Sequence, residues 1–313
     1  MQKGLVYRST GSWYDVKLND GTFIKARIGG KFRTLSIKTT NPIAVGDQVN
    51  VIFNAHNEAV IKAIEKRKNY IIRKSVNLSK EAHIIASNID LAVLLVTISN
   101  PITTPGFIDR FTVTAEAYNV PLLIVFNKLD LYDIKDLEKL KKFEEDYSKA
   151  GYRTLRTSVT ENLGVDEFKQ YIKDKTVMVS GNSGAGKSTL INLLIPNLEL
   201  KTSEISKSHK TGKHTTTFAE MFDMNDGTKI IDTPGIKGFG LVDFENDELA
   251  RYFPEMLSLL GKCKYHNCRH INEPGCKVLS EIESNSFSKT RYNSYLAMYN
   301  EDSENNYRQS IYG

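Results

Sequence analysis

The residues with the clearest chemical pattern form a glycine-rich loop in the middle of the chain. Residues 181–188 match G-x-x-x-x-G-K-[ST], with an apolar β-branched run before them and a helix-like run, 190–194, after them. Glycines let backbone N–H groups turn toward phosphate oxygens, and the helix adds the positive end of its dipole. The pattern therefore predicts a nucleotide phosphate site rather than a glycine-rich turn without a ligand.

Two side chains of this loop have expected roles of their own. Lys187 is predicted to reach the β- and γ-phosphates as a compact charge, and the Ser188 hydroxyl to ligate Mg²⁺. The residues of the loop expected to contact the nucleotide are Gly181, Asn182, Ser183, Gly184, Ala185, Gly186, Lys187, Ser188 and Thr189.

A second motif lies upstream, at the end of the apolar run 121–126. Asn127, Lys128, Leu129 and Asp130 fit N-K-x-D. An ionised Asp130 only accepts hydrogen bonds, so it suits the two donors that guanine presents and adenine lacks. Asn127 is expected to hold the base edge and the neighbouring loop, and the stem of Lys128 to cover one base face. Together with the phosphate loop, the tetrapeptide indicates a guanine nucleotide.

Four further positions complete the expected site. Ser158 follows a short predicted strand and resembles the serine loop that supports the guanine O6 in GTPases. Asp232 opens the D-x-x-G element, where its carboxylate would act on Mg²⁺ through water and the N–H of Gly235 would sense the γ-phosphate. A threonine among residues 215–217 should ligate Mg²⁺ with the triphosphate bound, and Thr216 is favoured. The D-x-x-G element and the segment with residues 215–217 are both predicted switches.

The residue that positions the attacking water is the open question. In Ras-like enzymes a glutamine follows D-x-x-G, whereas Ile236 stands there in this chain and cannot orient water. Slow intrinsic turnover and acceleration by a partner are therefore expected. His214 is proposed to position the water; the alternative is an ordinary surface histidine.

The chain has three cysteines, all in one C-terminal stretch. Cys263, Cys268, His270 and Cys276 give C-x4-C-x-H-x5-C, and three sulfurs with one nitrogen suit a tetrahedral, structural Zn²⁺. His266 is a rival nitrogen ligand that spacing does not exclude. The ion would tie down a C-terminal segment that, from its sequence, has little apolar content, with residues 300–313 expected to be frayed.

Composition and periodicity set the frame for these motifs. A chain of 313 residues is expected to form two or three domains, and its net charge of +5 hints at a polyanionic partner. No apolar run approaches the about 18 residues of a membrane span, and no signal peptide is apparent, so a cytoplasmic protein without membrane association is expected. Residues 88–240 alternate buried strands with helices, which is typical of a parallel α/β sheet.

The first 70 residues read as short strands with a hairpin turn at 19–21, and a five-stranded OB barrel is favoured. Basic and aromatic residues along it suggest an RNA-binding surface, although an ordinary solvated charged face is the alternative. These residues are Lys25, Arg27, Lys31, Phe32, Arg33, Lys38, Lys62, Lys66, Arg67, Lys68 and Tyr70.

The order of the motifs is unusual, because the guanine element at 127–130 precedes the phosphate loop, the threonine switch and D-x-x-G. A circular permutation explains this order, since the termini of compact domains often lie close together. On these motifs and the cysteine cluster, the chain resembles the circularly permuted GTPases, most closely the ribosome-small-subunit-dependent GTPase A family. The resemblance covers nearly the whole chain and favours His270 as the zinc ligand.

The resemblance implies a fold, a function and partners. The expected division is an OB-fold RNA-binding domain over 1–70, a circularly permuted P-loop GTPase domain over 71–240 and a helical zinc-binding domain over 241–313. The implied function is GTP hydrolysis stimulated by the small ribosomal subunit, with contact to rRNA and action late in subunit maturation. GTP, Mg²⁺ and one Zn²⁺ are the expected cofactors, and a monomer is expected. The alternative is an RNA-binding assembly factor that uses GTP as a structural ligand.

Overall fold

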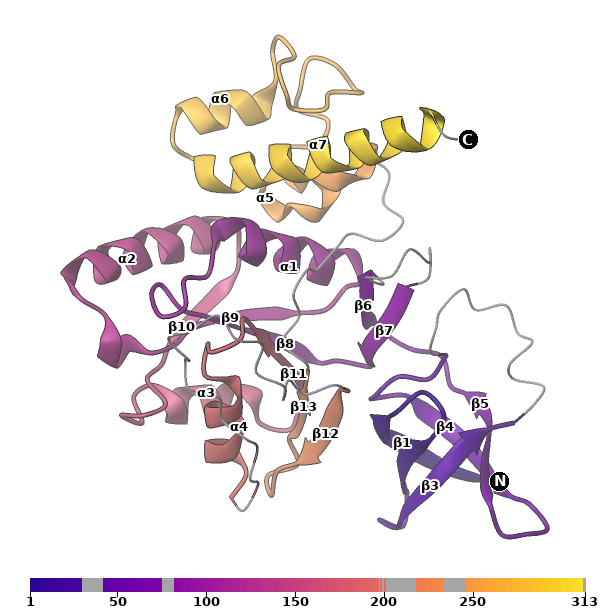
Figure 1. The fold of residues 1–313 in the computed structure, drawn as a ribbon. Helices are drawn as coiled ribbons and strands as arrows, with labels where there is room; N and C mark the ends of the chain where they lie inside the picture. The colour runs from indigo at the N-terminus through magenta and orange to yellow at the C-terminus, as the bar shows by residue number, and fades with distance from the viewer. Residues whose placement is uncertain are drawn as a thin grey trace.

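The structure is a computed structural model, which describes residues 1–29, 42–74, 82–196, 198, 200, 218–233 and 246–311. Figure 1 shows three parts: an N-terminal barrel, a central sheet with helices on both faces, and a C-terminal helical lobe that lies over one helical layer. No helix in the described ranges is long and apolar enough to cross a membrane.

The N-terminal barrel consists of β1 (Gln2–Ser9), β2 (Tyr14–Leu18), β3 (Phe23–Ile28), β4 (Gln48–Phe53) and β5 (Ala59–Ile64). The strands pair in the order β1-β2-β3-β5-β4, and β4 pairs back onto β1 to close the barrel. Burial alternates along β2, so every second side chain, such as Tyr14 and Val16, enters the barrel core. The predicted N-terminal barrel is confirmed.

A short hairpin, β6 (Tyr70–Lys74) and β7 (Ala82–Ser87), follows the barrel. Two residues assigned above to an RNA surface make contacts within the protein, near the connection between the barrel and this hairpin. Arg67 donates at 2.6 Å to both carboxylate oxygens of the fully buried Asp47, and Tyr70 packs on Tyr118 with ring centroids 4.8 Å apart. Arg67 and Tyr70 therefore stabilise the fold, which sequence alone could not separate from an exposed role.

The central sheet contains β10 (Arg153–Arg156), β9 (Leu122–Phe126), β8 (Leu91–Val96), β11 (Thr176–Gly181), β13 (Lys229–Asp232) and β12 (Glu220–Asp223), in that spatial order. The first five strands are parallel and β12 is antiparallel. Every residue of β8 is buried, as its continuous apolar run predicted. Helices α1 (Pro105–Ala117) and α2 (Ile134–Lys149) lie on one face of the sheet, with α3 (Val165–Ile172) and α4 (Lys187–Leu194) on the other (Figure 1).

The strand order shows how a permuted chain builds one nucleotide site. β9, which ends in the guanine motif, is separated from β11, which ends in the phosphate loop, by β8 alone. All three strands are parallel, so both motifs meet at the carboxyl edge of the sheet. In a GTPase with the ordinary motif order, the chain begins before the strand equivalent to β11 and ends after the helix equivalent to α3. In this chain α3 and β11 are joined covalently.

The C-terminal lobe contains η3 (Asn246–Tyr252), α5 (Pro254–Leu257), α6 (Lys277–Glu283) and α7 (Lys289–Ile311). The expectation of little apolar content is wrong, because the lobe has its own core, in which α1 also takes part through Val113. That core is rich in tyrosine and methionine, including Tyr292, Tyr295 and Met298, which a search for aliphatic periodicity misses. The expected fraying from residue 300 is also wrong, since α7 continues to Ile311.

One buried arginine joins this lobe to the central domain. Arg291 of α7 is 1% exposed; it donates to Asp109 of α1 at 2.6 Å and binds both carboxylate oxygens of Glu255 of α5. Three rings surround the guanidinium with their centroids 5.2–5.4 Å from Cζ: Tyr147, Tyr152 and Phe253. Because a buried charge is costly without partners, this network fixes how α7 sits on α1.

We expect Arg291→Met to lower the free energy of unfolding by about 3–5 kcal/mol, because it strands the buried Asp109 carboxylate. Urea unfolding followed by far-ultraviolet circular dichroism measures the change. Lys277→Met, which removes an exposed pair with Glu281, is the control and should cost less than about 1 kcal/mol. Adding Asp109→Asn to Arg291→Met should recover part of the loss; a loss that stays the same would contradict the explanation by a stranded charge.

Candidate nucleotide and metal sites

The phosphate loop has the backbone that the motif requires. β11 ends at Gly181, and α4 begins at Lys187 after Gly184 and Gly186, which have φ values of +82° and +100°. A Cβ on Gly181 would lie 2.5 Å from the carbonyl oxygen of Leu95, and a Cβ on Gly186 would lie 2.4 Å from Nδ2 of Asn127. Glycine is needed here for its left-handed backbone and for the close approach of neighbouring chains.

Lys187 already lies folded over the loop. Its Nζ donates to the carbonyl oxygens of Gly181 at 2.7 Å and Asn182 at 3.2 Å. Burial lowers the pKa of Lys187, and the nearby charge of Asp232 opposes that shift. The ammonium is thus held in place before any phosphate arrives, which reduces the ordering that binding requires.

Asn127 joins the guanine motif to the phosphate loop. Its side chain is 1% exposed; Nδ2 donates to the carbonyl oxygen of Ala185 at 2.9 Å, and Oδ1 accepts from Thr157 at 3.0 Å. Both halves of the carboxamide are therefore occupied by protein. Asn127 therefore contacts the neighbouring loops, as predicted, and its hold on the base edge stays a prediction.

Asp130, the residue predicted to bind guanine, is exposed beside this junction. Its carboxylate accepts a hydrogen bond from Oγ of the fully buried Ser158. Desolvation raises the pKa of Asp130, but the hydrogen bonds from Ser158 and from the backbone outweigh it, so the pKa lies below its usual value. An ionised, acceptor-only carboxylate suits the paired donors of guanine. Leu129 contributes its backbone N–H, which donates to the carbonyl oxygen of Thr157 at 3.2 Å.

Lys128 adopts a left-handed conformation, with φ 68° and ψ 37°, which turns the chain from β9 into the short helix η2 (Leu129–Leu131). Its Nζ donates to the carbonyl oxygen of Asn100 at 2.8 Å. The loop after β8 thus supports the guanine motif from one side. No sequence pattern pointed to Asn100, because this residue acts through its backbone carbonyl.

The Mg²⁺ side of the site is described in part. Asp232 is 3% exposed and pairs with Val179 on the phosphate-loop strand, and Thr233 donates to the carbonyl oxygen of Val179 at 2.9 Å. Ser188 is half-buried in the first turn of α4, and Thr189 after it is exposed. The predicted positions Thr216, His214 and Gly235, and also Ile236, lie outside the described residues.

Sequence reasoning missed two side chains that shape this site. Thr157 donates to Asn127, as described above, and the hydroxyl of Tyr132 donates to the carbonyl oxygen of Asn127 at 2.6 Å while it accepts from the N–H of Ile98 at 2.9 Å. Thr157 directly precedes the predicted Ser158, so its place in the serine loop could have indicated a role in the site. Tyr132 offered none, since an isolated tyrosine after N-K-x-D fits many roles.

The C-terminal cluster gathers four ligand atoms. One atom each from Cys263, Cys268, His270 and Cys276 lies within 4.8 Å of the others. Nδ1 of His270 is 3.6 Å from Sγ of Cys263 and 3.5 Å from Sγ of Cys276. Burial lowers the pKa of His270, which favours the neutral, ligating imidazole. His266 is exposed and is not part of the cluster.

Helix α7 and one carboxylate hold the loop that carries His270. The hydroxyl of Tyr292 donates to the carbonyl oxygen of His270 at 2.8 Å, and Tyr295 donates to that of Arg269 at 2.6 Å. Glu273 accepts from the N–H groups of Arg269, Ile271 and Asn272. These bonds hold His270 at φ +59° with its ring facing the sulfurs.

The Asp130 geometry predicts a change of base preference. In Asp130→Asn, the amide would offer a donor where guanine also has one, so GTP affinity should fall by at least about a hundredfold. Xanthosine triphosphate, which carries an acceptor at that position, should bind more tightly than to the unaltered chain. Titration with fluorescent nucleotides measures both, with the surface change Asp166→Asn as control. Unchanged selectivity in Asp130→Asn would contradict the assignment.

Comparison with known proteins agrees with this geometry. A family model for the RsgA GTPase matches residues 64–242, and a model for the RsgA N-terminal domain matches residues 3–61. The chain is 52% identical, over 99% of both chains, to "Small ribosomal subunit biogenesis GTPase RsgA" of Christiangramia forsetii. The protein of the same name from Flavobacterium johnsoniae is 53% identical over 99% of this chain and 96% of its own.

Two solved structures share the fold. YjeQ from Thermotoga maritima matches with a TM-score of 0.76 at 31% identity, over 96% of this chain and 98% of its own. YloQ, described as a circularly permuted GTPase, matches with a TM-score of 0.74 at 25% identity, over 97% and 96%. The permuted order inferred from the motifs is thereby confirmed. By its family models and its full-length relatives, the chain belongs to the RsgA GTPase family.

Proposed function

We propose that this GTPase acts in the biogenesis of the small ribosomal subunit, which it binds, and that the subunit stimulates its GTP hydrolysis and so times its release. The single observation that supports the proposal is the junction at Asn127, where the guanine motif with Asp130 is bonded to the phosphate loop at Ala185. Relatives at 52% and 53% identity, aligned over nearly their whole length, are named for small-subunit biogenesis.

The roles of the site residues belong to this proposal. Lys187 would stabilise the charge on the β- and γ-phosphates, Ser188 and Thr216 would ligate Mg²⁺, and Asp232 would act on the ion through water. Gly235 would report the γ-phosphate, and His214 would position the attacking water. Mg²⁺ would supply the charge neutralisation that phosphoryl transfer needs.

Exposed cations on and just after the barrel support contact with rRNA. Lys25, Lys62 and Lys66 are exposed, and no ion pair is recorded for them in the described part of the chain. Trp13, Phe23 and Phe53 expose 41–57% of their surface on the same barrel and offer faces on which bases stack. We also propose that the chain acts as a cytoplasmic monomer, without a membrane partner, with the three domains divided as predicted at residues 70 and 240.

We propose Zn²⁺ as the ion of the C-terminal cluster. A tetrahedral zinc with Zn–S of about 2.3 Å and Zn–N of about 2.0–2.1 Å separates its sulfur and nitrogen ligands by about 3.6 Å. The two separations from Nδ1 of His270 to sulfur are 3.6 and 3.5 Å, which fits this geometry. The ion would tie together the loop 263–276, which supplies all four ligands, and so have a structural role.

Turnover measured with and without purified small subunits tests the function. Because Ile236 stands where Ras-like enzymes have their water-positioning glutamine, basal hydrolysis should be slow, and small subunits should raise it by at least about tenfold. Large subunits at the same concentration serve as the control. Tight GTP binding with no stimulation would favour the alternative, an RNA-binding assembly factor for which GTP is a structural ligand.

The assignment of the nitrogen ligand is tested by metal analysis of the purified protein. The unaltered chain should carry one zinc ion, and His270→Ala should lower its zinc content and sensitise the C-terminal lobe to proteolysis. His266→Ala, a matched change in the same segment, should keep the metal. Equal loss in both variants, or loss in His266→Ala alone, would contradict the ligand set.

A further inference from the structure

The barrel contacts the central domain at the hairpin formed by β12 and β13. The N-terminal end of this hairpin follows the threonines at 215–217, and its C-terminal end is Asp232 of the D-x-x-G element. The hairpin is thus the piece of chain between the two predicted switches. β12 also pairs with barrel strand β1 through the residues Arg8 and Glu220, so the central sheet continues into the barrel.

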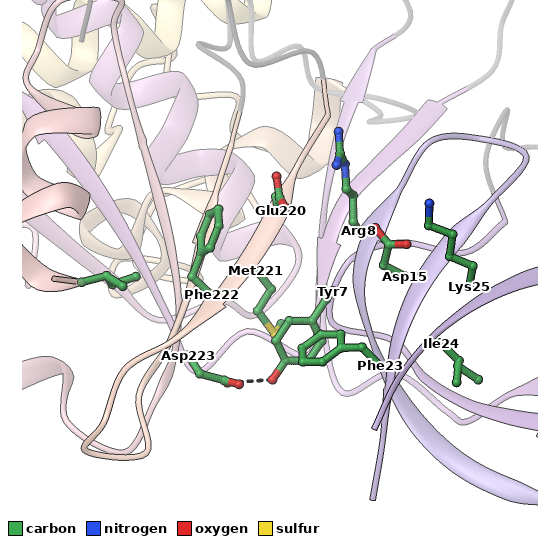
Figure 2. A pocket seen from close by; sticks show the side chains of 11 residues that line it. Tyr7, Arg8, Asp15, Phe23, Ile24, Lys25, Glu220, Met221, Phe222 and Asp223 are labelled. Atoms are coloured by element: carbon green, nitrogen blue, oxygen red, sulfur yellow. Dashed lines mark hydrogen bonds between the residues drawn. The ribbon is translucent and has the colours of Figure 1, made fainter. Parts of the chain in front are cut away.

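Asp223, at the end of β12, holds the two parts together. Its Oδ1 accepts from the hydroxyl of Tyr7 on β1 at 2.6 Å, and its Oδ2 from Nζ of Lys17 on β2 at 2.5 Å. Nζ of Lys229 on β13 lies 3.6 Å from Oδ1. Figure 2 shows the bond between Tyr7 and Asp223 across the junction. One carboxylate on β12 therefore binds side chains from two barrel strands and lies near a lysine of β13, the other strand of the hairpin.

The surroundings keep this contact together and leave space beside it. The ammonium of Lys17 lies 5.6 Å from the ring centroid of Tyr7 and 5.4 Å from that of Phe23, and the two rings meet edge to face at 5.1 Å. A cleft of about 470 Å³ opens beside them, with Phe222 and Glu220 on the hairpin side and Arg8 and Lys25 on the barrel side (Figure 2).

We propose that Asp223, through Tyr7 and Lys17, is a positioning residue for stimulated GTP hydrolysis: it couples the hairpin between the switches to the barrel. A ligand gripped by the barrel then biases the switches, and the bound nucleotide biases the barrel in return, because coupling between two sites is reciprocal. Charge-assisted bonds of this kind are strong enough to move two elements together. The link to ribosomal subunits rests on the proposed function; the coupling itself does not.

The chain contains an intrinsic fluorescent probe for the effect of the bound nucleotide on the barrel. Its one tryptophan, Trp13, lies in the turn between β1 and β2, the two strands that hold Asp223, and is 48% exposed. In the isolated protein, replacing GDP by a non-hydrolysable GTP analogue should change Trp13 fluorescence. Tyr7→Phe, which removes one hydroxyl, and Asp223→Asn, which removes the charge, should each reduce that change by at least half, with nucleotide affinity altered less than twofold.

Glu65→Gln is the matched control, because it neutralises another barrel carboxylate, whose ion pair with Lys3 is recorded away from the hairpin. It should leave the fluorescence change intact. The proposal is overturned if Trp13 in the unaltered protein does not respond to the nucleotide, or if Tyr7→Phe and Asp223→Asn respond as the control does. The fluorescence experiment needs no ribosomal particle, so its result is informative even if the proposed ribosomal function is wrong.

The second arm measures the ratio of subunit-stimulated to basal turnover. Tyr7→Phe and Asp223→Asn should lower that ratio at least about fivefold, the lower end of usual coupling strengths, and leave basal turnover unchanged. The loss should lie in kcat at saturating subunit, with subunit affinity in the GDP state retained. Parallel loss of basal and stimulated turnover would show a merely structural role and overturn the proposal, as would an unchanged ratio.

Discussion

The nucleotide site depends on one buried carboxamide. Asn127 uses its donor on the phosphate loop and its acceptor on Thr157, so three separate loops share one fixed geometry. A buried amide with both halves satisfied is stable, whereas one with a missing partner is costly, so the three loops hold one another in register. Gly186 belongs to the same constraint, because Nδ2 of Asn127 occupies the space that a Cβ would need.

This constraint explains why the permuted order preserves the geometry of the nucleotide site. The contacts at Asn127 depend on which strands are neighbours at the carboxyl edge, and β9, β8 and β11 keep their parallel neighbourhood whichever segment comes first. What permutation changes is the position of the free ends. The barrel now precedes the guanine strand, the C-terminal lobe follows the D-x-x-G element, and the sheet between them is unaltered.

The sequence predicted those parts of the site whose chemistry is local. The phosphate loop, the guanine tetrapeptide and the cysteine cluster each have fixed spacing, and the structure brings the residues of each together. Contacts between single residues that are far apart in the sequence could not be predicted. Arg291 reads as one more charge in a polar helix, and Arg67 as one more cation beside the barrel, yet both are bound to buried carboxylates. Pairwise partners of this kind leave no periodicity in one sequence.

The two outer lobes contact the central domain at different elements. The C-terminal lobe is fixed through Arg291 to α1, and α1 lies on the face of the sheet opposite α3 and α4. A desolvated charge network of this kind resists small shifts. The barrel pairs with the hairpin between the predicted switches through Arg8 and Glu220 and through the partly exposed Asp223. Its buried Asp47 also accepts a hydrogen bond from Ser87 at the end of β7, so this contact is one of several. In the proposed coupling, a nucleotide-dependent shift of the hairpin therefore reaches the barrel through Asp223, whereas Arg291 holds the C-terminal lobe to α1.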